Sequence, residues 1–238
     1  MPPPAPFNTT LWSTILQARD SEGTNRQAAL DRLCARYWTP LYAYLLRRGL
    51  KREDAQDAVQ GFFAYFLEKG LLDDVDPARG RFRRYLLAVL ERWLANERRT
   101  ASAAKRGGGL PHLSLDFARA DRELPLEAAA PGEPPDAAYR RVWALSILRE
   151  SMARLRREYR ELGRGRRFEA VAASLSAGAA RASGEELAAR LGVTPADVRR
   201  MIYDARQRLQ ETIRAVLRDT VGSEAEVDEE IRELFGSV

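Results

Sequence analysis

At 238 residues, of which 45% are apolar and 31% charged, the chain is long enough for one large domain or two small ones with buried cores. No run approaches the about 18 apolar residues of a membrane-spanning helix, and the opening MPPPAPFNTT lacks the basic and apolar parts of a signal peptide. The single cysteine, Cys34, has no intrachain disulfide partner. These features predict a soluble, cytoplasmic protein without membrane insertion.

Charge is distributed unevenly, although the formal net charge is only +5. Nearly all cations are arginines, whose guanidinium groups suit phosphates. Residues 79–106 contain nine basic and two acidic residues, a net charge of +7, whereas residues 219–233 contain seven acidic residues and one arginine, a net charge of −6. The first segment therefore favours anionic partners and the second repels them.

Three amphipathic helices are predicted in the first part of the chain. Apolar residues recur every three or four positions over residues 28–45, from about 54 to 69 and from about 81 to 99. Pro40 lies inside the first pattern. That helix either kinks there, or ends and is followed by a new helix with Thr39 as its cap.

Four more helices are predicted farther along the chain. A long one runs from residue 139 to about 163, and shorter ones follow at 168–175, 184–191 and 195–217. No stretch alternates apolar and polar residues as a half-buried strand does. The predicted fold class is therefore all-α, with two helical domains joined by a flexible linker.

The linker is the segment rich in proline and glycine between the two sets of helices, and its LSLDF is expected to dock locally. The segments are assigned from composition and periodicity. They are a disordered N-terminus at 1–6, a first domain at 7–105, the linker at 106–135, a second domain at 136–221 and an acidic amphipathic extension at 222–238.

The hairpin formed by the helices at 184–191 and 195–217 carries strong local signals. Ser183 stands three residues before Glu186, which is the pattern of a capping box. Gly192 allows the turn, and Thr194 caps a helix that begins with proline. A short turn of this kind between two packed helices is typical of a helix-turn-helix.

Taken as structure alone, this is a helical hairpin without a ligand. Its second helix, however, presents a small residue and several cations outward, and such a face suits a DNA groove flanked by phosphates. Asp204 interrupts the face and would repel a phosphate. The residues predicted to contact duplex DNA are Thr194, Ala196, Arg199, Arg200, Tyr203, Arg206 and Gln207.

Three motifs carry a family resemblance. EDAQDAVQGFFAYFLEK at 53–69, GRFRRYLLAVLERWLANERR at 80–99 and EELAARLGVTPADVRRMIYDARQRL at 185–209 resemble, in order and spacing, bacterial sigma factors of the sigma-70 family, extracytoplasmic-function type. The motifs are similar, in turn, to the segments of that family that bind RNA polymerase, melt the promoter and read the −35 element.

The resemblance implies a sigma region 2-like helical bundle and a sigma region 4-like helix-turn-helix domain that bring core RNA polymerase to promoter DNA. It implies no cofactor, metal or catalytic residue, and leaves open an anti-sigma or other regulatory protein as a further partner. Core-polymerase binding is implied for Asp54, Asp57, Gln60 and Phe63. Contact with the single strand of the −10 element is implied for Asp76, Arg79, Arg81, Phe82, Arg83, Arg84, Trp93, Asn96, Arg98 and Arg99.

Other interpretations of several residues stay open. Phe82 and Trp93 fit core packing as well as they fit stacking on bases. Asp54 and Asp57 also fit a helix cap and a solvated face. The acidic extension is expected to cover part of the second domain or to bind a regulator.

Other functions are also weighed. The single histidine and single cysteine can build neither a Cys/His metal site nor a histidine-based triad, and no phosphate-binding glycine motif occurs, which argues against an enzyme. A stand-alone helix-turn-helix regulator, dimeric on palindromic DNA, would leave residues 79–106 without a role. A sigma-like protein that only binds a regulatory partner is a third possibility. We expect a sigma factor.

Overall fold

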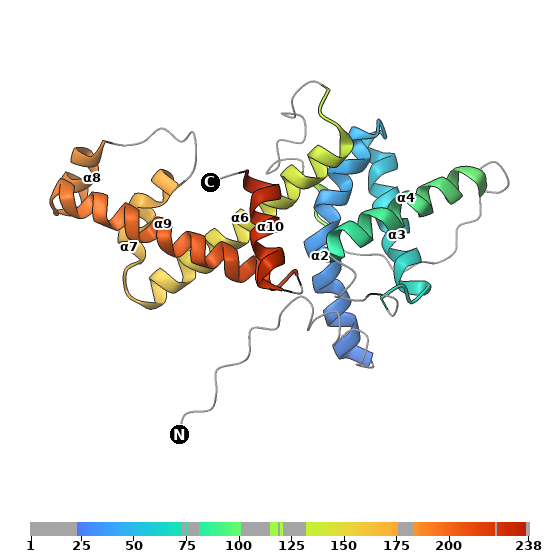
Figure 1. Ribbon diagram of the computed structural model, residues 1–238, viewed down its shortest axis with the longest axis horizontal. Helices are drawn as coiled ribbons and strands as arrows, with labels where there is room; N and C mark the ends of the chain where they lie inside the picture. Colours follow the sequence, from blue (N-terminus) through green and yellow to red (C-terminus); the bar gives the residue numbers. More distant parts are fainter. Residues whose placement is uncertain are drawn as a thin grey trace. The chain divides into compact units, whose positions relative to one another are not determined.

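The computed structural model describes residues 23–72, 75, 81–100, 115–118, 120, 132–175, 183–221 and 223–236. All regular elements in these ranges are helical and no strand occurs among them, which confirms the all-α class (Figure 1). None of the described helices is both long and apolar enough to cross a membrane. The described residues form two compact units, unit 1 within Met1–Leu145 and Arg218–Val238 and unit 2 within Ser146–Leu217.

Unit 1 has a core of aromatic side chains contributed by several helices. Tyr37 stacks on Trp143 with ring centroids 4.8 Å apart, and meets Phe82 edge to face at 5.1 Å. All three side chains are fully buried. The helices of this unit are α2 (Gly23–Arg47), α3 (Arg52–Glu68), α4 (Phe82–Thr100), the first part of α6 (Pro135–Glu161) and α10 (Glu224–Phe235).

Helix α2 continues through Pro40 and does not end there, so the alternative of a new helix capped by Thr39 is wrong. A proline inside a helix costs about 3 kcal/mol because it removes a hydrogen bond and crowds the preceding turn. Here Tyr37, Leu41 and Tyr42 are fully buried on either side of it. Burial of such large side chains offsets that cost.

Part of the predicted linker packs on unit 1. The ring of Phe117 meets Trp38 and Tyr42 of α2 edge to face, with centroids 4.9 Å and 5.3 Å apart. The expected docking of LSLDF is therefore confirmed for its phenylalanine. Most of residues 106–135, and residues 1–22, lie outside the described ranges.

Unit 2 contains two apolar clusters that follow from the amphipathic patterns of its helices. Leu155, Phe168 and Leu209 form one cluster. Leu187 and Ala188 pack against Val198 in the other, which holds the hairpin together. The elements of this unit are the remainder of α6, α7 (Gly165–Ala172), the 3-10 turn η2 (Ala173–Leu175), α8 (Gly184–Leu191) and α9 (Pro195–Arg218).

The division between the units differs from the predicted one at both ends. It falls inside α6, after Leu145, because Tyr139 and Trp143 are buried in the core of unit 1. At the other end, α10 belongs to unit 1. The acidic extension thus packs within unit 1, whereas it was expected to cover part of the second domain or to bind a regulator.

Candidate nucleic-acid interface

The turn between α8 and α9 is shaped by local hydrogen bonds. The Ser183 hydroxyl accepts from the amide of Glu186 at 3.1 Å, and the Glu186 carboxylate accepts from the amide of Ser183 at 2.9 Å. This confirms the predicted capping box. Gly192 has φ 66° and ψ 37°, the left-handed conformation that glycine adopts without strain.

Thr194 caps α9 together with a residue that the sequence analysis missed. Its hydroxyl donates to the Asp197 carboxylate at 2.6 Å and accepts from the Asp197 amide at 3.2 Å, while its own amide donates to the same carboxylate at 3.0 Å. These hydrogen bonds lower the pKa of Asp197. The Thr194 hydroxyl, predicted to contact DNA, thus serves the helix cap. Asp197 three residues after a capping threonine was the available signal.

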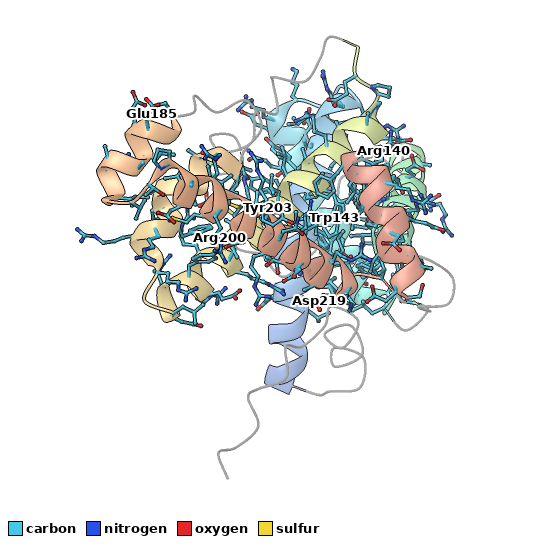
Figure 2. The ribbon with its side chains drawn as sticks, turned by 60° about the vertical axis from the view of Figure 1, so that its left-hand side comes forward. Arg140, Trp143, Glu185, Arg200, Tyr203 and Asp219 are labelled. Atoms are coloured by element: carbon cyan, nitrogen blue, oxygen red, sulfur yellow. The ribbon has the colours of Figure 1, made fainter. Side chains whose placement is uncertain are left out.

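The other predicted duplex contacts are brought together on α9. Val198, Ala205 and Leu209 are buried on its inner side. Tyr203 is 63% exposed, which is unusual for a large aromatic side chain. Arg200 and Tyr203 both lie on α9 (Figure 2). The predicted residues of this helix with exposed side chains are Ala196, Arg199, Arg200, Tyr203, Arg206 and Gln207.

Arginines line the surface on two sides of α9. A hollow of about 590 Å³ is lined in part by Arg164, Arg167 and Arg200. Asp197 and Asp204 also line it, so its charge is mixed. A second hollow, of about 600 Å³, is lined in part by Arg199, Tyr203 and Arg206.

Only some of the arginines in the two hollows were among the predicted DNA contacts. Arg206 donates to the backbone carbonyl of Ser174 at 3.2 Å, so part of its guanidinium is engaged within unit 2. Arg164 and Arg167 were missed, although GRGRR at 163–167 is a local signal of basic character. The surface around α9 is therefore wider than the predicted face.

Some residues at the start of α4 that were predicted to contact DNA are buried. Arg81 and Arg83 are only 7% and 3% exposed, and Phe82 is fully buried. The two arginines form ion pairs with carboxylates of α10. Carboxylates of α10 therefore occupy both side chains in the structure, and contact of Arg81 and Arg83 with DNA stays a prediction that requires α10 to move away. Phe82 packs against Tyr37 at 5.1 Å, which bears out core packing.

Three carboxylates of α10 make these ion pairs. Arg83 donates to both oxygens of Glu230, at 2.5 Å and 2.9 Å, and Arg81 pairs with Glu229 at 3.0 Å. Glu233 pairs with Arg81, with Arg83 at 2.9 Å and with Arg84 at 2.7 Å. The pairing joins residues about 150 positions apart in the sequence, as the separation of 147 between Arg83 and Glu230 illustrates.

The ion pairs change the protonation equilibria of their members. Burial opposes ionisation of Glu233, but the guanidinium groups of Arg83 and Arg84 outweigh it and lower its pKa to about 2. Burial likewise opposes the charge of Arg83, yet Glu230 and Glu233 raise its pKa above the ordinary value. Both groups are therefore charged at neutral pH.

The remaining residues predicted for the single strand are placed differently. Arg84 and Asn96 have exposed side chains. Trp93 is half-buried, and its ring lies 6.0 Å from Phe62 and 6.5 Å from Tyr65, measured between centroids, so it packs partly on α3. The residues outside the described part of the chain are Asp76 and Arg79, and the side chains of Arg98 and Arg99.

The residues implied to bind core polymerase do not share one exposed surface. Asp54 and Asp57 are exposed on α3, and Gln60 is half-buried. Phe63 is fully buried, with its ring 5.5 Å from Phe62. The assignment of Phe63 to a partner surface is contradicted in this conformation, because the side chain faces the core.

No group of three or more His, Cys, Asp or Glu side chains that could hold a metal occurs in the described part of the chain. Comparisons of this chain with family models, curated proteins and solved structures give no match. Inferences about its activity therefore rest on the residues and contacts of the chain itself.

Proposed function

We propose that the protein is a sigma factor that binds core RNA polymerase and directs initiation at promoters. In this proposal unit 2 reads duplex DNA through α9, and unit 1 binds polymerase and the melted strand. Promoter DNA and core polymerase are the partners, and the protein catalyses no bond chemistry. The localisation that goes with this role is the cytoplasm.

The hairpin of unit 2 is the observation that carries the proposal. Its turn is held by two caps and a left-handed glycine, so α9 projects in one defined direction. Arg199, Arg200 and Tyr203 are exposed on it. A helix lying in the major groove needs polar side chains toward base edges and cations toward the phosphates on either side. The arginines of the two flanking hollows supply such cations.

Unit 1 supports the proposal less directly. Asp54 and Asp57 offer an exposed acidic edge on α3, and Arg84, Trp93 and Asn96 retain partly or fully exposed side chains on α4. The start of α4 is covered by α10, so the full single-strand surface of this proposal requires a rearrangement in unit 1.

That cover is also the observation that favours a second candidate, a stand-alone helix-turn-helix regulator. Such a protein needs only the surface of unit 2, and Arg81 and Arg83 would then be permanent parts of the core. The two candidates differ in one requirement. A sigma factor acts through polymerase, whereas a stand-alone regulator binds a duplex operator without it.

Run-off transcription with purified core polymerase tests the proposal. The full chain should produce discrete transcripts from genomic fragments of the source organism, which polymerase alone does not produce. Arg199→Glu should reduce these transcripts about tenfold or more, because one base or phosphate contact contributes about 1–3 kcal/mol. Arg157→Glu makes the same charge change at an exposed arginine on α6 of unit 2 and should leave the yield near wild type.

Absence of polymerase-dependent transcripts, together with tight binding of a duplex fragment by the protein alone, would replace the proposal by the regulator. Equal activity of Arg199→Glu and the wild type would remove α9 from the DNA interface. Equal losses in Arg199→Glu and Arg157→Glu would show that only the total charge of unit 2 matters.

A further inference from the structure

The first turn of α4 carries positive side chains where the helix dipole is also positive. The N-terminal end of a helix carries partial positive charge and favours anionic side chains. Helix α4 has no acidic residue in its first turn, which contains Arg83 and Arg84, and Arg81 immediately precedes the helix. Three arginines at the positive end of a helix dipole require anions from elsewhere.

Helix α10 supplies those anions on one face. Glu229, Glu230 and Glu233 are spaced so that all three carboxylates reach the arginines of α4. Glu230 is 1% exposed and also accepts from the indole of Trp143 at 3.2 Å. By contrast, the Glu229 side chain is 58% exposed and that of Arg84 62% exposed. Their partners, Arg81 and Glu233, are mostly buried, so only the outer side of this group of ion pairs is open to competing ions.

Apolar packing contributes only modestly to the docking of α10. Val227 is its one fully buried apolar side chain, while Ile231, Leu234 and Phe235 are half-buried. A helix of 12 residues is only marginally stable by itself, so α10 depends on its contacts with the rest of unit 1. Its docking therefore depends on these apolar contacts together with the ion pairs to Arg81, Arg83 and Arg84.

Departure of α10 would leave buried arginines without partners, which is costly unless another anion replaces the carboxylates. A nucleic-acid strand presents closely spaced phosphates, and arginine pairs with phosphate in the same two-pronged manner as with carboxylate. Phosphates of a DNA strand can therefore replace the α10 carboxylates as partners of Arg81, Arg83 and Arg84, so that the arginines remain paired. Partly exposed Trp93 on the same helix offers a ring for an unstacked base.

We propose that α10 occupies, within the chain, a single-stranded DNA site at the start of α4, and that DNA and α10 exclude each other there. This rests on the proposed function and adds its regulation: unit 1 grips the melted strand only when α10 has left. The apparent affinity for single strands is lowered by the fraction of molecules in which α10 is docked.

The test measures binding of fluorescein-labelled oligothymidylate to the full chain, and hydrogen exchange of α10 in the same samples. On saturating wild type with this DNA, amides of α10 should lose protection while those of α3 keep it. Glu229→Gln with Glu233→Gln weakens the outer pairs and retains Glu230 against Arg83. This double variant should bind the DNA about tenfold more tightly.

The matched control is Glu53→Gln with Glu68→Gln, which removes the same two charges from unit 1. Both residues are exposed on α3 and neither belongs to α10, so the ion pairs between α10 and the start of α4 stay intact. The control should bind as the wild type does. An equal gain in both double variants would show an effect of net charge and overturn the proposal.

Two further measurements test whether α10 and DNA compete: DNA binding by a chain that lacks α10, and hydrogen exchange of α10 in the DNA-saturated wild type. If α10 stays protected in the double variant Glu229→Gln with Glu233→Gln, a chain ending at Val221 takes its place, with far-UV circular dichroism to verify folding. Unchanged DNA affinity once α10 is unprotected or removed would overturn the proposal. So would wild-type protein that is saturated with the DNA but keeps α10 protected.

Failure here is distinguishable from failure of the proposed function. A protein that supports promoter-dependent transcription, yet shows no link between α10 and single-strand affinity, remains a sigma factor with α10 as a structural helix. A protein that binds single strands by displacing α10, yet never acts with polymerase, refutes the sigma role and retains the competition.

Discussion

At the scale of single residues, Glu230 explains why α10 lies where it does. Its carboxylate accepts from Nε and Nη2 of Arg83 and from the indole of Trp143, and the residue is 1% exposed. A buried carboxylate is stable only when all such partners are present. The residue therefore specifies one docking position for α10, whereas Glu229 at its exposed edge adds little specificity.

Cys34 gives a prediction at the same scale. Burial, followed by the charge of Asp31, raises its pKa to about 12. The thiolate is the reactive form, and a rise in the pKa from 9.0 to about 12 lowers the thiolate population at neutral pH about a thousandfold. We expect iodoacetamide to label native protein far more slowly than denatured protein, as measured by mass spectrometry.

Denatured protein is the internal control, because Cys34 is the single cysteine of the chain and one label is the maximum. Rapid stoichiometric labelling of native protein would show that α2 opens readily around this residue. The buried environment shown by the structure, with Cys34 1% exposed, would then be transient.

At the scale of elements, α8 and α9 are positioned by local chemistry, and α10 by distant charge. The caps at Ser183 and Thr194 use partners three residues away. The ion pairs of α10 instead join it to α4 across most of the chain. The docking of α10 must therefore respond to pH and salt in a way that the hairpin does not.

Acid should weaken the docking of α10. The pKa of Glu233 is lowered from 4.5 to about 2 in the folded protein, so its contribution is complete above about 4.5 and is lost as the pH falls toward 2. Arg83, whose pKa Glu230 and Glu233 raise above its ordinary value, stays charged throughout. Urea unfolding followed by far-UV circular dichroism should show a fall in stability within that pH window.

Glu233→Gln serves as the comparison, because it cannot titrate. The stability difference between this variant and the wild type should shrink as the pH falls from about 4.5 toward 2. A difference that is constant over this range would show that Glu233 is not ionised in its contacts with α4.

At the scale of the whole molecule, two cores share one continuous helix. The first part of α6 contributes Tyr139 and Trp143 to unit 1, and the remainder contributes Leu155 to unit 2. Each unit also has its own set of internal contacts. A defect in one core is expected to be felt mainly in that unit.

Phe168→Ala tests this independence. The ring is fully buried between Leu155 and Leu209, and its removal should cost about 3–5 kcal/mol. Hydrogen exchange should accelerate in α7, α8 and α9 and stay slow in α2 and α3. The exposed Leu162→Ala is the control and should change neither set. Equal acceleration in both units would mean that the chain unfolds as one cooperative body.

Much of this architecture could be predicted because its signals are local. Helices appeared near their predicted positions since an amphipathic period of three to four residues is written directly in the sequence. The Ser183 and Thr194 caps and the turn at Gly192 followed for the same reason. The exposed residues of α9 could then be named, because the inner side of that helix was evident from its apolar spacing.

Predictions failed where a residue has two suitable environments. Phe63 and Phe82 fit a partner surface or a core equally well as isolated letters, and only the packing of three helices buries them. Arg81 and Arg83 are suited equally to phosphate and carboxylate, so their pairing with Glu230 and Glu233 could not be read from α4 alone.

The sequence by itself determined an all-helical chain, the approximate positions of its main helices and a capped hairpin with cations on its outer side. Periodicity and capping depend on neighbours within a few residues, so they are legible without a fold. The tertiary structure decided that the acidic helix α10 covers the basic start of α4 and that α6 serves two cores. Such pairings are set by which complementary surfaces can bury charge and apolar area together, and that is a property of the folded chain.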